Sequence, residues 1–250
     1  MRDREMPLED HLQELRVRIL ISLAAVVVGF GIGYVTARPV LAWILLRVGL
    51  PHGVIVTGVT EAFFAVLKIA FVIGLVLASP VILYQAAAFV FPGLLPHERR
   101  AVSILVVPGL LLFLAGMAAG FFWIVPVVLR IMLSFTGPDV QPFFTLGKLL
   151  SFIFNLTLPF GVIAELPLVA GALARLGILS PAWFERQRRY AVLIAFVLAA
   201  ALAPPDAVSM LLMALPIYLV YELAALVVRL AWREKAAFEG VTDIDGPPEG

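Results

Sequence analysis

Residues 160–169 read FGVIAELPLV and place one carboxylate, Glu165, inside an apolar segment. From Leu149 to Ala174 the chain has no other charged residue. The whole sequence shares this character: 62% of its 250 residues are apolar, 14% are charged, and the mean hydropathy is +1.06. In soluble domains, roughly a quarter of the residues are charged. The sequence therefore predicts an integral membrane protein with an acid inside one of its spans.

Charge-poor runs of roughly 20 residues, long enough to cross about 30 Å of hydrocarbon as helices, give the predicted architecture. We expect an all-α fold with six transmembrane helices at residues 17–37, 61–91, 101–134, 147–175, 190–203 and 207–229. Residues 1–235 form a single six-span membrane domain, and residues 236–250 are predicted to be an acidic, disordered tail. Unequal span lengths and internal prolines predict kinked helices that form a concave wall. These prolines are Pro80, Pro108, Pro126, Pro159, Pro167 and Pro216.

The basic residues predict the orientation in the membrane. Six spans put both termini on one side, and 13 of the 18 Lys and Arg residues fall on that side. Because cytoplasmic loops carry the excess of basic residues, both termini are predicted to be cytoplasmic. We therefore expect a multi-pass protein of the cytoplasmic (inner) membrane, in contact with lipids. A net charge of +1 argues against a nucleic-acid partner.

Catalytic motifs are not evident in the sequence. There is no cysteine, and the three histidines (His11, His52 and His97) lie far apart outside any metalloprotease pattern. No glycine-rich loop with a phosphate-binding lysine is present. We therefore expect no enzyme activity, metal or cofactor, and any energy input must come from an ion gradient or a partner.

Two acids lie among arginines next to predicted spans. Glu14 belongs to PLEDHLQELRVR (7–18), and Glu98 belongs to HERR (97–100). Either segment can be an interfacial anchor whose arginines reach lipid headgroups. Alternatively, the two carboxylates together receive a ligand with two positive charges, for which guanidinium groups are suited because they pair with carboxylates bidentately. The residues alone leave both interpretations open.

Glu165 is the stronger candidate for function. A carboxylate in the middle of a span costs at least ~2.5 kcal/mol and usually faces a protein interior or a wet cavity. Pro167 follows two residues later and frees a backbone carbonyl, which is typical of a lined cavity. The structural alternative is hydrogen bonding within the fold, for which the candidate donors are Gln85, Asn155 and Thr157.

Two further acids lie near the last predicted span. Glu222 interrupts that span and has a structural interpretation, an ion pair with Arg229 two turns along. Asp206 follows Pro204-Pro205, where an aspartate most often caps the next helix.

Four segments match a known family in their order along the chain. They are HLQELRVR before the first span, SPVILYQAAAFVFPGLLPHERR (79–100), FGVIAELPLVA (160–170) and LAPPDAVS (202–209). Together they resemble TatC, the core subunit of the twin-arginine protein translocase, from about Pro7 to Arg233. The resemblance implies a receptor for the twin-arginine signal peptides of folded cargo, with export powered by the protonmotive force. It also implies TatA- and TatB-like single-span membrane partners and a homo-oligomer in the working complex.

The resemblance also implies roles for individual residues. Glu14 and Glu98 match the acids that receive the two signal arginines. The matching residues around that cytoplasmic site are Arg16, Phe89, Arg99 and Arg100. Residues expected to contact partner or signal helices in the membrane are Glu165, Gln85 and Glu222, and Asp206 belongs to an external turn. The alternative function is a proton-coupled small-solute carrier that uses Glu165 as its protonation site.

Overall fold

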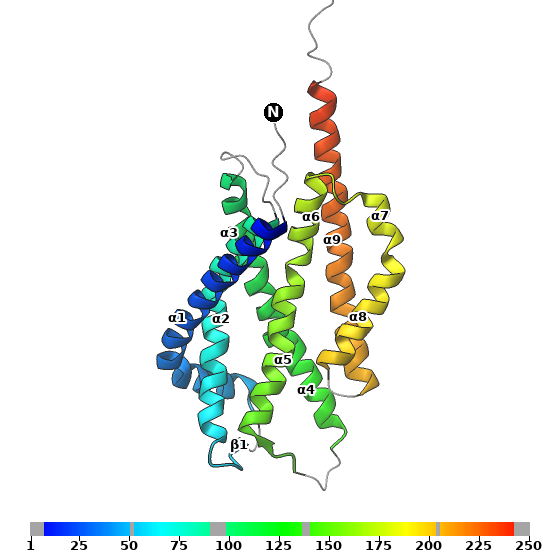
Figure 1. Cartoon of the computed structure of the whole chain (residues 1–250). Helices are drawn as coiled ribbons and strands as arrows, with labels where there is room; N and C mark the ends of the chain where they lie inside the picture. Colours follow the sequence, from blue (N-terminus) through cyan, green and yellow to red (C-terminus); the bar gives the residue numbers. More distant parts are fainter. Residues whose placement is uncertain (1–7, 51–52, 91–98, 137–140, 204–205, 243–250) are drawn as a thin grey trace, which may run out of the picture. The chain divides into compact units, whose positions relative to one another are not determined.

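The computed structural model describes residues 8–50, 53–90, 99–136, 141–203 and 206–242 (Figure 1). Five of its helical segments are long and apolar enough to cross a membrane: Leu12–Val48, Glu61–Phe89, Leu105–Ser134, Leu146–Arg175 and Ala207–Arg233. The predicted helical membrane character is therefore confirmed. The chain divides into two units, Met1–Leu114 with Leu133–Phe154, and Ala115–Met132 with Asn155–Gly250.

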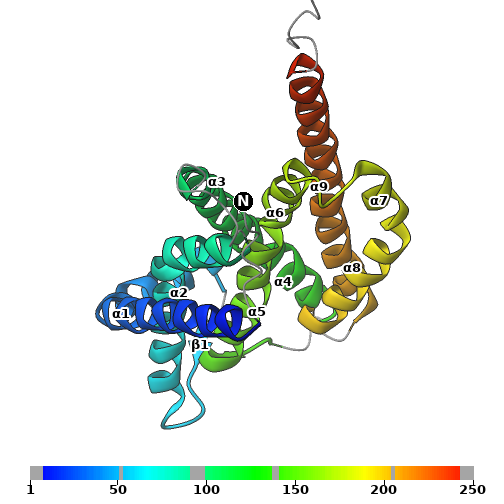
Figure 2. The ribbon, with the colours of Figure 1, turned by 45° about the horizontal axis from the view of Figure 1, so that its top comes forward.

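In the first unit, α1 (Leu8–Val48) lies beside α2 (Glu61–Val90), as Figures 1 and 2 show. With 41 residues, α1 extends beyond both ends of the predicted span 17–37 and continues through Pro39. It ends where Gly49 adopts a positive φ of 62° and donates its N–H to the Leu45 carbonyl at 3.2 Å. Glycine has no Cβ and adopts this left-handed conformation at little cost.

Small residues allow the backbones of α1 and α2 to touch. A Cβ on Gly29 would lie 2.6 Å from the Gly74 carbonyl oxygen, and a Cβ on Gly33 would collide with the Ala70 carbonyl. Small residues four positions apart are what membrane helices use for close van der Waals packing. We call Gly29, Gly33, Ala70 and Gly74 the small-residue seam. Its pairing fixes α1 and α2 as antiparallel neighbours.

Polar contacts connect the segment before α2 to the start of α5 in the first unit. β1 (Val54–Ile55) pairs in parallel with β2 (Phe144–Thr145), immediately before α5 (Leu146–Ala164). Glu61 joins these segments because its Oε1 accepts the Gly147 N–H at 2.7 Å and its Oε2 accepts the Thr57 N–H at 2.7 Å. These bonds tie the start of α2 to the start of α5.

The helix that passes from the first unit into the second is interrupted by a π-helical turn. α3 (Arg99–Ala119) leads into η1 (Gly120–Ile124) and then α4 (Val125–Ser134). Pro126 follows the turn and has no N–H for a helical bond. α3 and η1 pack tightly on α5, since a Cβ on Gly120 would lie 3.0 Å from the Thr157 Cα. The proline at 167 also follows a break, whereas Pro80, Pro108, Pro159 and Pro216 lie inside α-helices.

Glycine and serine define the chain reversal after α6 (Leu166–Arg175). Gly177, with φ 80°, donates its N–H to Ala174, and the next N–H bonds to the Leu173 carbonyl at 3.0 Å, which closes the helix end. Ser180 then starts α7 (Pro181–Arg186), because its Oγ accepts the Trp183 N–H at 3.2 Å.

The remaining two helices differ strongly in length. α8 (Arg188–Leu202) has 15 residues, or about 22 Å. It matches the predicted span 190–203 but is not among the five long helices. α9 (Ala207–Thr242) has 36 residues, so the first part of the predicted disordered tail is helical. The rest of that tail lies outside the described residues. Figure 2 shows α6 and α8 beside α9, in agreement with the contacts.

A buried cluster holds α6 and α7 against α9. It consists of Ala170, Ala174, Phe184, Ala224, Ala225, Val228 and Ala231. Most of its members are alanines, which lets the helices approach closely, and Phe184 fills the remaining space under α7. Much of the apolar side-chain surface on the other faces of these helices is exposed, as expected for contact with lipid.

We predict that Gly74→Ala destabilises the protein, because the new Cβ would lie 2.6 Å from the Phe30 backbone nitrogen. Overpacking of this kind costs about 1–3 kcal/mol. Gly31→Ala is the matched control, since nothing lies within 4 Å of its added Cβ. Thermal unfolding in detergent should show a lower midpoint for Gly74→Ala only. Equal midpoints would mean that the small-residue seam does not hold α1 on α2.

Candidate functional site

Glu14, the first predicted ligand-binding acid, is ion-paired with Arg18 one turn along α1. The Arg18 Nε donates to Glu14 Oε1 at 3.1 Å, and Nη2 donates to the same oxygen. The Glu14 side chain is 29% exposed and that of Arg18 is 19% exposed. The carboxylate predicted to receive a guanidinium group therefore already holds one from its own helix.

Arg18 also connects this pair to α2. Its Nη1 donates to the backbone carbonyl of Gln85 at 3.4 Å. Phe89 is on α2 one turn after Gln85, close to the end of the helix at Val90. The structure thus brings Glu14 to the last turns of α2, next in sequence to the segment that contains Glu98. Gln85 takes part through its backbone, on the α1 side of α2.

The other residues predicted for the cytoplasmic site are only partly described. Arg16 is exposed on α1. Arg99 and Arg100 begin α3, and their side chains lie outside the described part of the structure. Glu98 lies outside the described residues. Whether Glu98 approaches Glu14 stays a prediction.

Glu165 lies at the break between α5 and α6 in the second unit. Its carbonyl accepts the N–H groups of Leu168 and Val169, both at 3.1 Å, and so starts α6. Pro167 occupies the first turn of α6, where its missing N–H is tolerated. The chain therefore interrupts its long apolar helix at Glu165, the one ionisable residue between Leu149 and Ala174.

The Glu165 side chain is partly buried and has an unsatisfied oxygen. Among the described residues, Oε1 has no hydrogen-bond partner, and neither does the buried Oγ1 of Thr157. Of the hydrogen bonds predicted as the structural alternative, one from Thr157 to this oxygen is therefore not formed. An unpartnered buried carboxylate oxygen is an acceptor site for a hydrogen-bond donor from outside the chain or from water.

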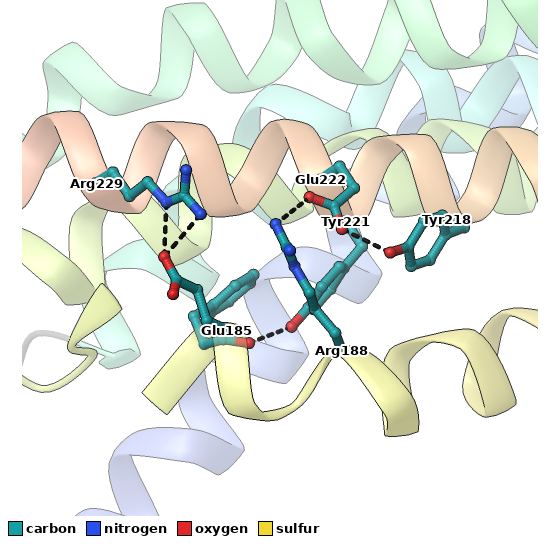
Figure 3. A network of polar contacts seen from close by, with 7 residues as sticks. Glu185, Arg188, Tyr218, Tyr221, Glu222 and Arg229 are labelled. Carbon is teal, nitrogen blue, oxygen red and sulfur yellow. Dashed lines mark hydrogen bonds and ion pairs between the residues drawn. The ribbon is translucent and has the colours of Figure 1, made fainter. Parts of the chain in front are cut away.

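Glu222 on α9 belongs to a network that ties three helices together (Figure 3). It accepts a hydrogen bond from Tyr218 at 2.6 Å and forms an ion pair of 2.8 Å with Arg188 of α8. The structural interpretation that paired it with Arg229 is wrong. Arg229 instead pairs with Glu185 of α7 at 2.7 Å.

Tyr221 completes this network. Its hydroxyl donates to the Phe184 carbonyl, and its ring stacks on the Phe184 ring with 4.7 Å between centroids. We call Glu185, Arg188, Tyr218, Tyr221, Glu222 and Arg229 the α9 clasp. Apart from Glu222, these residues were not predicted as a site from the sequence. The spacing of Tyr218 and Glu222 could have indicated their contact, because residues four apart share a helix face.

Asp206 caps α9, as its sequence context predicted. Its Oδ1 accepts the Ser209 N–H at 2.7 Å, which satisfies one of the free donors of the first turn. In the part of the chain that the structure describes, no group of three His, Asp or Glu residues could hold a metal ion.

Comparison with known proteins gives the family. The model of the Sec-independent protein translocase protein (TatC) family matches residues 10–216. This chain belongs to the TatC family. TatC of Carboxydothermus hydrogenoformans is 41% identical over 231 residues, which cover 92% of this chain and 95% of that protein. TatC of Aquifex aeolicus is 36% identical, covering 92% of this chain and 98% of that protein.

Solved structures agree with this membership. A crystal structure described as the twin-arginine translocase receptor TatC superposes with a TM-score of 0.78 at 36% identity, covering 88% of this chain and 99% of that chain. A second TatC crystal structure, in the detergent DDM, gives 0.79 at 34% identity, covering 87% and 98%. TatC proteins are components of a protein transport system, and the small-solute carrier finds no support in these matches.

We predict that Tyr221→Ala weakens the α9 clasp far more than Tyr221→Phe. Phenylalanine keeps the stacked ring and loses one hydrogen bond, worth about 1 kcal/mol, whereas alanine also leaves a cavity, and such truncations cost about 3–5 kcal/mol. Tyr34→Ala is the matched control, an equal truncation of an exposed tyrosine on α1 that is not part of the clasp. Limited proteolysis of the segment around α7, or thermal unfolding, should show a large loss of stability for Tyr221→Ala and a smaller loss for Tyr221→Phe. Equal effects of the two Tyr221 variants would contradict a packing role for the ring.

Proposed function

We propose that this chain is the signal-peptide receptor and core subunit of a twin-arginine translocase. In this role it binds the twin-arginine signal peptides of folded cargo and works with TatA- and TatB-like single-span proteins in a homo-oligomeric complex powered by the protonmotive force. TatC family membership over most of the chain supports the translocase role. The observation that carries the receptor role is the Glu14 carboxylate, which is accessible and already suited to hold a guanidinium group.

The proposed binding site lies where α1 begins and α2 ends. Glu14 and Glu98 each receive one arginine of the signal, and Arg16, Phe89, Arg99 and Arg100 surround them. A guanidinium group suits such acids better than an ammonium group, because its planar fork can bond both oxygens of one carboxylate. The requirement for arginine over lysine follows from this geometry.

The proposed topology places the site in the cytoplasm. α8 forms a sixth span in addition to the five long helices, so that both termini face the cytoplasm across the inner membrane. The excess of basic residues on the terminal side supports this orientation. Kinked helices of unequal length then form a concave wall toward partner helices, with Asp206 at an external turn.

We predict that Glu14→Ala and Glu98→Ala each abolish crosslinking of a twin-arginine precursor while leaving the protein inserted. Each variant removes the acceptor for one signal arginine, and a signal with Lys-Lys should crosslink weakly to the unaltered protein. Photo-crosslinkers at positions neighbouring 14 and 98 give the readout. Glu185→Ala is the matched control, because it removes an acid from a Glu–Arg pair between α7 and α9 in the second unit. Unchanged crosslinking in either acid variant would count against that acid as a ligand for the signal.

Glu165 has a separate proposed role, as an acceptor for partner or signal helices within the membrane. Its buried and unpartnered Oε1 at a helix break supports this role. A buried acceptor without a donor is costly, so a helix that brings a hydroxyl or amide to this oxygen would gain a strong hydrogen bond. Gln85 and Glu222 remain proposed contacts for the same helices.

We predict that Glu165→Gln retains export of a folded twin-arginine reporter and that Glu165→Ala loses most of it. Glutamine keeps a carbonyl acceptor at this position but cannot titrate, whereas alanine removes both properties. Export is measured by the periplasmic reporter, and partner contact by crosslinking from position 165. An inactive Glu165→Gln, with partner crosslinking intact in both variants, would contradict the acceptor role and favour proton transfer.

A further inference from the structure

We propose that Arg18 is a specificity-determining residue of the signal-binding site. It occupies the Glu14 carboxylate while no signal is bound, and a signal arginine must displace it to form a bidentate pair with both carboxylate oxygens. This inference rests on the proposed function, because it concerns the same carboxylate. It adds an internal competitor to a site that otherwise consists of acceptors.

The contacts of Arg18 show why displacement is required. Both Nε and Nη2 donate to Glu14 Oε1, so the lone pairs of that oxygen are in use. Among the described residues, Oε2 accepts no hydrogen bond. A ligand guanidinium needs both oxygens for a bidentate pair. It can bond Oε2 end-on while Arg18 stays, but the fork forms only after Arg18 leaves Oε1.

Arg18 has a place to remain after displacement. Its Nη1 already donates to the Gln85 carbonyl of α2, and its side chain is four-fifths buried. The guanidinium can therefore release Glu14 without leaving the surface of α2. The small-residue seam keeps this carbonyl within reach, since it holds α1 and α2 in one register.

Because Arg18 must be displaced, a single ligand cation gains less binding free energy at Glu14. When one guanidinium replaces another on the same carboxylate, the bonds gained and lost are nearly equal. The displaced Arg18 also keeps a positive charge close to the incoming ligand, which opposes binding. A peptide with one arginine therefore gains little at Glu14. A peptide with two arginines also gains the binding free energy of its second arginine at another acceptor. Tight binding therefore requires both arginines.

A lysine in the signal is penalised further by Arg18. An ammonium group offers no planar fork. It therefore competes poorly with the Arg18 guanidinium, which already makes two hydrogen bonds to Oε1. In the absence of Arg18, the same lysine would meet an unoccupied carboxylate. Arg18 thus widens the difference in affinity between Arg-Arg signals and their lysine variants.

The test measures equilibrium binding of fluorescent signal peptides to the full-length purified protein in lipid nanodiscs. The probes are one peptide with Arg-Arg, one with Arg-Lys and one with Lys-Lys. Arg18→Gln should bind the Arg-Arg peptide about threefold to tenfold more tightly, and the Lys-containing peptides should gain at least as much. Arg18→Lys should lie between the unaltered protein and Arg18→Gln, because it keeps the charge and loses the fork.

A double variant separates exchange from a general effect of charge. In the Glu14→Gln background, Arg18→Gln should give no more than a small further gain, since no carboxylate remains to be freed. An equal gain in both backgrounds would show that Arg18 acts by long-range repulsion and would overturn the exchange. Weaker or unchanged binding in Arg18→Gln would also overturn it, and weaker binding would indicate that Arg18 holds Glu14 in place.

Two controls keep the outcome clear. Thermal unfolding of each variant reports folding, and Arg18→Lys carries the test if Arg18→Gln does not fold. Failure of the unaltered protein to prefer the Arg-Arg peptide would contradict the proposed function itself. A clear preference that does not depend on Arg18 would contradict only the exchange.

Discussion

The contact of two backbones in the small-residue seam sets the positions of Glu14 and Arg18 in the first unit. Gly29 meets Gly74 and Gly33 meets Ala70, with backbone atoms in close approach at both points. In this antiparallel register, Arg18 lies eleven residues before Gly29 and Gln85 lies eleven residues after Gly74, and these two residues are in contact. The place of Glu14 therefore depends on glycines that lie more than four helical turns away in α1 or on α2.

The second unit is organised around α9 in a different way. Small residues again permit close approach on one side, where a Cβ on Gly171 would meet the Val227 side chain at 2.6 Å. On the other side, the α9 clasp ties α7 and α8 to α9 through charged and hydroxyl groups. Together they fix α6, and with it the break at Glu165. A partly buried acid is thereby held at the end of a packed helix and not in a loop.

The parts of this structure that the sequence predicted are those set by local chemistry. Apolar runs gave the helices, Pro167 marked the break beside Glu165, and Asp206 capped α9 as an aspartate in that position does. The parts that were missed depend on tertiary contacts or on competing local preferences. The partner of Glu222 comes from α8, 34 residues earlier, while Arg229 of the same helix turns to α7. Pro39 lies inside α1, although proline usually favours a helix end. Arg18 was counted as one of many basic residues near the membrane, although its spacing from Glu14 is that of a helical ion pair.

The shortness of α8 has a consequence for the surrounding lipid. Fifteen residues cover about 22 Å, whereas a bilayer has a hydrocarbon thickness of about 30 Å. With α8 as a span beside the much longer α9, the acyl chains next to it are compressed by about 8 Å, or headgroups and water descend to meet the helix ends. In the proposed six-span topology, the bilayer along this edge of the protein is thinner than elsewhere, which lowers the barrier to a polar polymer that enters there.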